Sequence, residues 1–290
     1  MRISTTQQRR PDWLKIKLDT SESFQTTREI INQKMLNTVC VEARCPNIYE
    51  CWNRKTATIM ILGDTCTRSC GFCSVKTGKP SAQDNFEPYR VAEAVKKMDL
   101  KHVVITSVDR DDIKDDYGAT IWAETISQIH SVTPDCSVEV LTPDFKAYES
   151  SLLKVFNAQP EIFSHNVECV KRISKSVRAQ SNWDRTLDIL KMSVDFGLLT
   201  KTGMMVGLGE NDEEVFETME EIALIGVKIF NIGQYLQPSK DHLPVSRFAH
   251  PDQFKVYKEF GLDLGFKVVE SGPLVRSSYH ADEQVKLYSN

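Results

Sequence analysis

The hydrophobic residues between positions 56 and 264 follow two alternating patterns. Short apolar runs rich in β-branched residues are typical of buried strands, and apolar residues spaced three or four apart are typical of helices that pack on one side. Strands are predicted at 56–63, 101–108, 137–142, 162–167, 200–206 and 228–236, and helices at 91–98, 119–130, 148–156, 183–196, 213–225 and 253–264. A further helix is predicted at 23–35, with Ser21 or Ser23 as its N-cap.

Strands that alternate with helices in this way predict an α/β fold with a parallel sheet and right-handed crossovers. Six such units are too few to close an eight-stranded barrel, so we expect an open, partial (β/α)6 barrel. The predicted parts are an N-terminal extension at 1–55, the barrel at 56–265 and a C-terminal tail at 266–290. The arm at 1–22 would rest on the body through Trp13 and Leu14, or else would cover the upstream cysteine site or contact an acidic partner.

Polar residues crowd the carboxyl ends of the predicted strands, where parallel α/β proteins place their sites. They lie at 106–112, 141–144, 164–168, 205–210 and 234–239. Helix capping accounts for Asp144 and Asp212. It does not account for 164–168, because these residues put polar groups on both faces of what should be a buried strand end. His165 there is placed to meet a ligand or substrate.

The charge of the chain argues against nucleic acid as a partner. At 290 residues the chain has a formal net charge of -4 and a pI near 5.9, so it has no broad attraction for phosphate. No apolar run approaches the roughly 20 residues that span a bilayer, and the N-terminus lacks the apolar core of a secretory signal. We therefore expect neither a nucleic-acid nor a membrane partner.

Six of the eight cysteines fall into two triplets, Cys40, Cys45 and Cys51 at CxxxxCxxxxxC spacing and Cys66, Cys70 and Cys73 at CxxxCxxC spacing. Three thiols do not close the tetrahedral coordination of a structural zinc site. Disulfides fit poorly, because a chain of this length can bury its own core and shows no secretory signal. Two iron-sulfur clusters fit best, and their free thiols require a reducing compartment, which favours the cytoplasm. We interpret Cys136 and Cys169 as small buried residues.

The CxxxCxxC motif, with Phe72 before its third cysteine, resembles the signature of the radical S-adenosylmethionine enzymes. With the upstream triplet and the tail Arg276-Ser277-Ser278-Tyr279, the resemblance narrows to the lipoyl synthases and runs along nearly the whole chain. It implies a partial (β/α)6 barrel, two [4Fe-4S] clusters and S-adenosylmethionine as cofactor. The implied reaction inserts sulfur at C6 and C8 of an octanoyl chain on a lysine of a carrier protein.

The resemblance also implies a role for particular residues. Cys66, Cys70 and Cys73 would hold the cluster that binds S-adenosylmethionine, and the residues that contact this cofactor would be Thr106, Ser107, Thr142, Asn166, Glu168 and Arg178. Cys40, Cys45, Cys51 and Ser278 would hold the auxiliary cluster that donates sulfur, with Ser278 favoured over Ser277. Gly207 and Gly209 resemble a glycine turn beside the adenine. His280 and Asp282 would support the tail.

The implied partners are octanoylated lipoyl carrier proteins, namely the E2 lipoyl domain of the 2-oxoacid dehydrogenases and the H protein of glycine cleavage. An electron donor such as flavodoxin or ferredoxin and an iron-sulfur assembly or repair protein are also expected. Two alternatives stay open: another two-cluster radical enzyme, such as a methylthiotransferase acting on tRNA, and a non-catalytic electron carrier. The first would be expected to carry an RNA-binding domain and a basic surface, and the second would need no place for S-adenosylmethionine.

Overall fold

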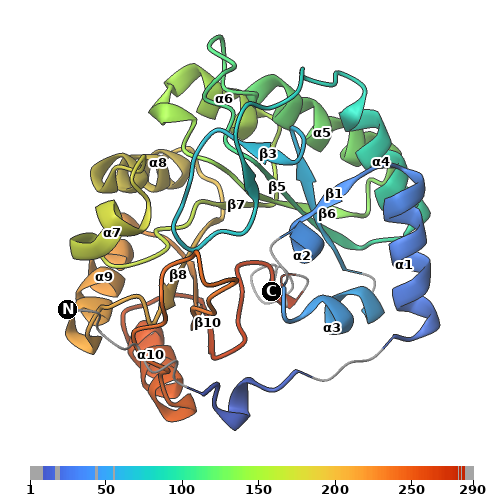
Figure 1. The fold of residues 1–290 in the computed structure, drawn as a ribbon. Coiled ribbons are helices and arrows are strands. Elements are labelled where there is room, and N and C mark those ends of the chain that lie inside the picture. Colours follow the sequence, from blue (N-terminus) through green and yellow to red (C-terminus); the bar gives the residue numbers. More distant parts are fainter. Residues whose placement is uncertain are drawn as a thin grey trace.

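An eight-stranded sheet forms the centre of the protein in the computed structural model (Figure 1). The structure describes residues 9–16, 20–42, 45–54, 56–279, 281 and 283–284. His280, Asp282 and half of the predicted arm, residues 1–8 and 17–19, therefore lie outside the described residues. Within the described residues no helix has the length and apolar character that a bilayer span requires.

The strands run in the spatial order β1-β2-β5-β6-β7-β8-β9-β10. Six of them match the prediction: β2 (Thr58–Ile61), β5 (His102–Ser107), β6 (Ser137–Leu141), β7 (Ile162–Ser164), β8 (Thr200–Val206) and β9 (Ile229–Gln234). All neighbours from β2 to β10 are parallel. The order leaves β1 and β10 as the two edges of the described sheet, so the partial barrel is confirmed.

The two edge strands were not predicted. β10 (Val268–Gly272) adds a parallel strand beside β9, and β1 (Asn37–Thr38) pairs antiparallel with β2. β10 has only two apolar residues and β1 only two residues, so neither carries the pattern of a buried strand. A separate pair, β3 (Thr65–Cys66) and β4 (Lys76–Thr77), carries the first cysteine of the CxxxCxxC loop.

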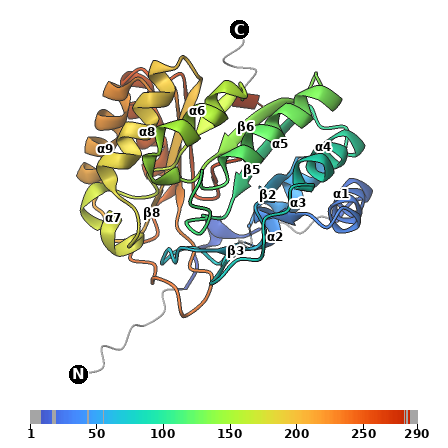
Figure 2. The ribbon, with the colours of Figure 1, turned by 90° about the horizontal axis from the view of Figure 1, so that it is seen from above.

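Helices surround the sheet (Figures 1 and 2). They are α4 (Glu87–Lys97), α5 (Ala119–Val132), α6 (Glu149–Asn157), α7 (Lys171–Val177), α8 (Trp183–Asp195), α9 (Asp212–Ile225) and α10 (Pro251–Asp263). Alternate strand residues such as Ile59, Ile61 and Val103 pack into the main hydrophobic core. The intervening residues face the barrel interior, and several of them are buried and polar. One face of each strand thus holds the fold together while the other is available for chemistry.

The N-terminal extension contributes α1 (Glu22–Gln33) and two short helices that were not predicted, α2 (Val39–Glu42) and α3 (Ile48–Asn53). Ser21 is the N-cap of α1, because its Oγ accepts a hydrogen bond from the Phe24 amide at 3.4 Å. The Phe24 ring lies against Tyr49 and Trp52 of α3, with centroids 5.3 and 5.1 Å apart. Aromatic packing therefore fixes α3, the helix that carries Cys51, against α1.

Two capping predictions have different outcomes. Asp144 caps the short 3-10 helix η2 (Phe145–Ala147), since its carboxylate accepts from the Lys146 amide. The prediction for Asp212 was wrong, because Asn211 is the N-cap of α9 and forms a capping box with Glu214. Asp212 instead pairs with Arg247.

Candidate active site

A cavity of about 510 Å³ opens among the carboxyl ends of the strands. It is lined by five of the six triplet cysteines, Cys40, Cys45, Cys66, Cys70 and Cys73, and by Ser278. Cys51 lies in a smaller adjoining pocket, whose wall also includes Cys40, Cys45 and Ser278. Figure 2 shows α2 and β3, which carry the first cysteine of each triplet, at the same end of the barrel. The fold thus brings two separate sequence motifs to one site.

The six residues expected to contact S-adenosylmethionine also line the large cavity: Thr106, Ser107, Thr142, Asn166, Glu168 and Arg178. Their roles stay predictions. Gly207 and Gly209 are absent from the described walls of both cavities. Gly207 has a positive φ of 100°, and a Cβ there would lie 2.2 Å from Nε2 of Gln234. Close packing against Gln234 therefore explains why a glycine occupies position 207.

The loop from Cys66 to Cys73 is fixed by hydrogen bonds to distant segments. The Sγ of Cys66 accepts from the backbone amides of Arg68 at 3.4 Å and Asp109 at 3.3 Å. The Gly71 amide donates to the Val177 carbonyl, and the Leu243 amide donates to the Gly71 carbonyl, both at 2.9 Å. Amides that point at a sulfur favour its ionised form, so these two oppose the larger effect of burial, which raises the pKa of Cys66 to about 11.

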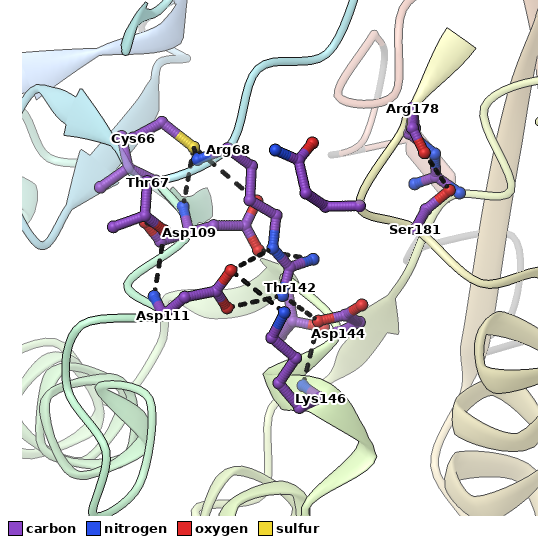
Figure 3. A network of polar contacts seen from close by, with 12 residues as sticks. Cys66, Thr67, Arg68, Asp109, Asp111, Thr142, Asp144, Lys146, Arg178 and Ser181 are labelled. Atoms are coloured by element: carbon purple, nitrogen blue, oxygen red, sulfur yellow. Dashed lines mark hydrogen bonds and ion pairs between the residues drawn. The ribbon is translucent and has the colours of Figure 1, made fainter. Parts of the chain in front are cut away.

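Arg68 lies at the centre of an ion network with Asp109, Asp111 and Asp144 (Figure 3). Its Nε and Nη2 each lie 2.8 Å from a different carboxylate oxygen of Asp111, and Nη2 lies 2.7 Å from Oδ1 of Asp144. The Arg68 side chain is only 7% exposed. We call these four residues the Arg68 ion network. Because Arg68 lies between Cys66 and Cys70, the network anchors the cysteine loop to the ends of β5 and β6.

Two further cations contact the Arg68 ion network. Lys146 contacts Asp111 and Arg185 contacts Asp144, so with Arg68 three cations face the three carboxylates. Burial acts to raise the pKa of Asp144, but hydrogen bonds from Arg68 outweigh it and hold the pKa at about 2. Burial raises the pKa of Asp109 to about 6, against the attraction of Arg68. Apart from its place within the cysteine motif, no sequence pattern indicated a role for Arg68.

The polar residues after β7 are incompletely paired. Nδ2 of Asn166 donates to Oε1 of Glu168 at 3.1 Å and to Oγ of Ser277 at 2.7 Å. In the described part of the chain, Oδ1 of Asn166, Nε of Arg178 and Nε2 of His165 have no hydrogen-bond partner. Such atoms are costly to bury without a partner, and their residues line the large cavity, so His165, Asn166 and Arg178 are candidates to bind a polar molecule there.

His165 is a hydrogen-bond acceptor in this cavity. Its Nδ1 lies 2.9 Å from the Thr142 carbonyl, which requires a proton on Nδ1 and leaves Nε2 unprotonated. Burial lowers the pKa of His165 to about 4, so the ring is neutral at pH 7. Glu168 adopts a positive φ of 68°, which is uncommon for this residue type. The site therefore contains both unpaired polar atoms and local strain.

The tail, residues 273–279, enters the barrel beside the upstream cysteines. The amide Nδ2 of Asn231 donates to the carbonyls of Arg276 at 3.2 Å and Ser277 at 2.9 Å. The two serines have different partners: Oγ of Ser277 accepts from Asn166, whereas Oγ of Ser278 accepts from Oγ1 of Thr58 at 2.8 Å. Only Ser278 of the pair lines both cavities among the described residues.

The donor set fits iron-sulfur clusters. Burial is the largest influence on all six triplet thiols and raises their pKa, to about 11 for Cys40 and about 12 for Cys51. Such thiols ionise only when a metal supplies positive charge. No three His, Cys, Asp or Glu side chains among the described residues are arranged around a single metal ion. A cluster does not need that arrangement, because each cysteine binds a different iron.

Cys136 and Cys169 are 2% and 0% exposed, as expected for small buried residues. In the described structure, neither of these two cysteines lines the large cavity or the adjoining pocket. Residues that the sequence analysis missed include Arg68, Thr58 and Asn231. Each acts through a partner far away in the sequence, so no local motif indicated it.

Comparison with known proteins places the chain among radical enzymes. The model of the radical SAM superfamily matches residues 60–222. A lipoyl synthase of Shouchella clausii (strain KSM-K16) is 54% identical over 280 residues, which cover 96% of this chain and 90% of the relative. A lipoyl synthase of Rubrobacter xylanophilus is 52% identical over 96% of this chain and 87% of the relative. Streptococcus suis SuiB bound to precursor peptide SuiA has a similar fold, with a TM-score of 0.59 at 11% identity over 78% of this chain and 50% of SuiB.

Proposed function

The chain belongs to the lipoyl synthase family of the radical SAM superfamily, and we propose that its two cysteine triplets hold its two [4Fe-4S] clusters. The enzyme inserts sulfur atoms at C6 and C8 of an octanoyl chain bound to a lysine of a lipoyl carrier protein. When bound, one cluster with S-adenosylmethionine supplies the radical that removes hydrogen, and the other cluster supplies the sulfur. The observation that carries the assignment is the single cavity lined by cysteines of both triplets.

In this proposal Cys66, Cys70 and Cys73 hold the cluster that binds S-adenosylmethionine. The unpaired Nε of Arg178 would pair with the carboxylate of this cofactor, and the free Oδ1 of Asn166 would accept from one of its donors. Glu168 and His165 offer further acceptors, and Thr106, Ser107 and Thr142 complete the wall. These side chains would bind and orient the cofactor and exclude water from it.

Cys40, Cys45, Cys51 and Ser278 would hold the second cluster. A serine oxygen is a harder ligand than a thiolate, so an iron bound to serine should leave more readily when sulfur is removed. Ser278 is preferred because it lines the pocket that contains all three cysteines, whereas Ser277 is paired with Asn166. Replacing Ser278 with Ala should destabilise the cluster more than replacing Ser277. The reverse order would move the ligand to Ser277.

Three parts of the chain divide this work. The extension at 1–55 would bring the upstream cysteines, the barrel at 56–265 the S-adenosylmethionine site, and the segment at 266–290 both β10 and the tail with Ser278. We place the enzyme in the cytoplasm, because its unpaired thiols need a reducing compartment. The proposed carrier proteins are the E2 lipoyl domain and the glycine cleavage H protein. Flavodoxin or ferredoxin would supply electrons, and an assembly or repair protein would rebuild the donor cluster.

Anaerobic reconstitution followed by turnover tests the proposal. We expect an octanoyl-lysyl peptide to give 5'-deoxyadenosine and a dithiolated product, and free octanoic acid to react poorly. The reason is that binding energy from the lysine and its neighbours places the chain against the radical. Equal turnover of the acid and the peptide would show that the tether is not recognised. A protein that binds iron but does not cleave S-adenosylmethionine would refute the assignment of the cavity.

A further inference from the structure

Thr58 is buried at the start of β2 and lines both the large cavity and the adjoining pocket. It is 5% exposed. Its neighbours Ile59 and Ile61 pack into the main core, so the alternation of the strand turns Thr58 toward the barrel interior. Pairing of Thr58 with Val104 of β5 fixes its backbone. The position of the Thr58 hydroxyl is therefore set by the sheet.

One of the four proposed auxiliary ligands, Ser278, contacts this residue directly. Oγ1 of Thr58 donates to Oγ of Ser278 at 2.8 Å. The other three proposed ligands, Cys40, Cys45 and Cys51, line the adjoining pocket together with Thr58 and Ser278. The Thr58 hydroxyl therefore lies beside the proposed ligand oxygen, in a wall that it shares with the three cysteines.

The direction of the hydrogen bond between the two hydroxyl groups matters for the chemistry. Thr58 donates its only side-chain proton to Ser278, so the Ser278 oxygen acts as an acceptor in this contact. An oxygen that binds iron gives up its own proton and then carries negative charge. A hydrogen bond to a charged oxygen is stronger than one to a neutral oxygen. The contact would therefore strengthen when Ser278 becomes a ligand.

We propose that Thr58 is a positioning residue that holds the Ser278 oxygen on the auxiliary cluster and so controls how fast the iron at that corner leaves. The inference rests on the proposed role of Ser278 and adds a residue that sets how firmly Ser278 holds iron. Without the Thr58 hydroxyl, the Ser278 oxygen would lose the donor that orients it and would hold iron less firmly. Residues that orient a metal ligand commonly change metal affinity by about 10–100-fold when they are replaced.

The test measures iron loss rather than turnover. The full-length Cys66→Ala, Cys70→Ala, Cys73→Ala variant is reconstituted anaerobically, so that the bound iron reports on the auxiliary site, and is mixed with an iron(II) chelator without S-adenosylmethionine. We expect Thr58→Val, which keeps the shape but removes the donor, to lose iron about tenfold faster. Thr58→Ser, which restores the donor, should return to the parent rate. The same substitutions are then made in the holoenzyme.

Matched variants separate this effect from loss of packing. Thr125→Val is the control, because Thr125 is also fully buried but donates to the Ile121 carbonyl of its own helix. It should leave iron loss unchanged. If Thr58→Val does not fold, Thr58→Ala takes its place. Faster loss in Thr58→Val that Thr58→Ser does not reverse would mean that packing and not the hydroxyl is responsible, and would overturn the inference.

Ser278→Ala separates the proposed role of Ser278 as a ligand from the inferred role of Thr58 in positioning it. Faster iron loss in Ser278→Ala, with no further increase in the Thr58→Val, Ser278→Ala double variant, would support both, because the two changes act through one oxygen. Faster loss in Ser278→Ala but not in Thr58→Val would overturn the role of Thr58 and leave the ligand in place. Unchanged loss in Ser278→Ala would refute Ser278 as a ligand and the Thr58 inference with it.

Discussion

The Cys66 triplet lies on a loop held by ions and hydrogen bonds, whereas the Cys40 triplet lies on two short helices and the segment between them, held by apolar packing. Arg68 ties the first loop to Asp111 and Asp144, and amides point at the Cys66 sulfur. Around the second triplet, Cys40 is 6% exposed and Trp52 is 2% exposed, and both belong to the main core. The two triplets share one cavity but differ in what surrounds them.

This difference matches the different tasks that we propose for them. A cluster that cleaves S-adenosylmethionine repeatedly must keep its irons, and a loop fixed from several distant segments resists distortion. A cluster that gives up sulfur must come apart. The hydroxyl of Ser278 and a separate tail offer a coordination corner that can open. We infer that the protein keeps one cluster by a rigid loop and releases the other through its tail.

Removal of one triplet at a time tests the comparison most strongly. The Cys66→Ala, Cys70→Ala, Cys73→Ala variant should keep about half the iron and lose S-adenosylmethionine cleavage entirely, because each cluster carries four irons. The Cys40→Ala, Cys45→Ala, Cys51→Ala variant should also keep about half the iron, yet still produce 5'-deoxyadenosine without any sulfur-containing product. Iron analysis and product assays check both. Loss of all iron from either variant would indicate one shared site.

Replacement of Arg68 should have the next largest effect. Arg68→Met leaves three carboxylates without their common cation, which should lower the free energy of unfolding by about 3–5 kcal/mol. Chemical denaturation of the cluster-free protein measures this. After reconstitution the variant should also lose iron from the Cys66 triplet before the Cys40 triplet.

Arg172→Met is the matched control for Arg68→Met. Arg172 also contacts one carboxylate, that of Glu214, through two nitrogens, but its side chain is 59% exposed. Exposed ion pairs contribute about 0–1 kcal/mol, so this variant should be nearly as stable as the parent. Similar losses in the two arginine variants would show that the Arg68 ion network does not anchor the loop.

Acid should weaken the Arg68 ion network. Arg68 holds the pKa of Asp144 at about 2, below its ordinary value of 3.8, so the stability that this carboxylate contributes is complete above pH 4 and is lost as the pH falls toward 2. Between pH 5 and pH 3 the cluster-free protein should lose about 1 kcal/mol more than Asp144→Asn. Burial raises the pKa of Asp109 to about 6, and the charge of Asp144 adds to the rise, so the difference between the two proteins reports on Asp144 together with its coupling to Asp109. If the unfolding free energies of the parent and of Asp144→Asn fell in parallel between pH 5 and pH 3, the role of Asp144 in the Arg68 ion network would be contradicted.

Sequence patterns were sufficient for the barrel strands and the six cysteines, but not for what fixes those cysteines. Periodicity found the long elements, whereas α2 and α3 have only four and six residues and show no full helical repeat. The spacing of cysteines is local and could be read directly. Arg68 and Asp144 are 76 residues apart, and Thr58 and Ser278 are 220 apart, so only the fold reveals these pairs.

The most local predicted effect concerns the contact between the Cys40 triplet and the tail. Asn47 occupies the N-cap position of α3, yet its side chain does not cap the helix. Its Nδ2 instead donates to the carbonyl of Leu274 at 2.7 Å, and the residue is 6% exposed. Asp in its place has a similar shape but no donor, so Asn47→Asp should cost about 1–3 kcal/mol of unfolding free energy.

Asn182→Asp provides the same chemical change at a site where it should be harmless. Asn182 is the N-cap of α8, and its oxygen accepts from the Arg185 amide, a role that an Asp carboxylate also fills. Limited proteolysis should therefore cut the tail faster in Asn47→Asp but not in Asn182→Asp, with 5'-deoxyadenosine formation preserved in both. The preserved cleavage is expected because Asn47 lies outside the described wall of the large cavity and bonds to the tail rather than to the Cys66 loop. If Asn47→Asp abolished cleavage as well as loosening the tail, the two triplets would depend on one another, and the contrast between a fixed loop and a releasable tail would fail.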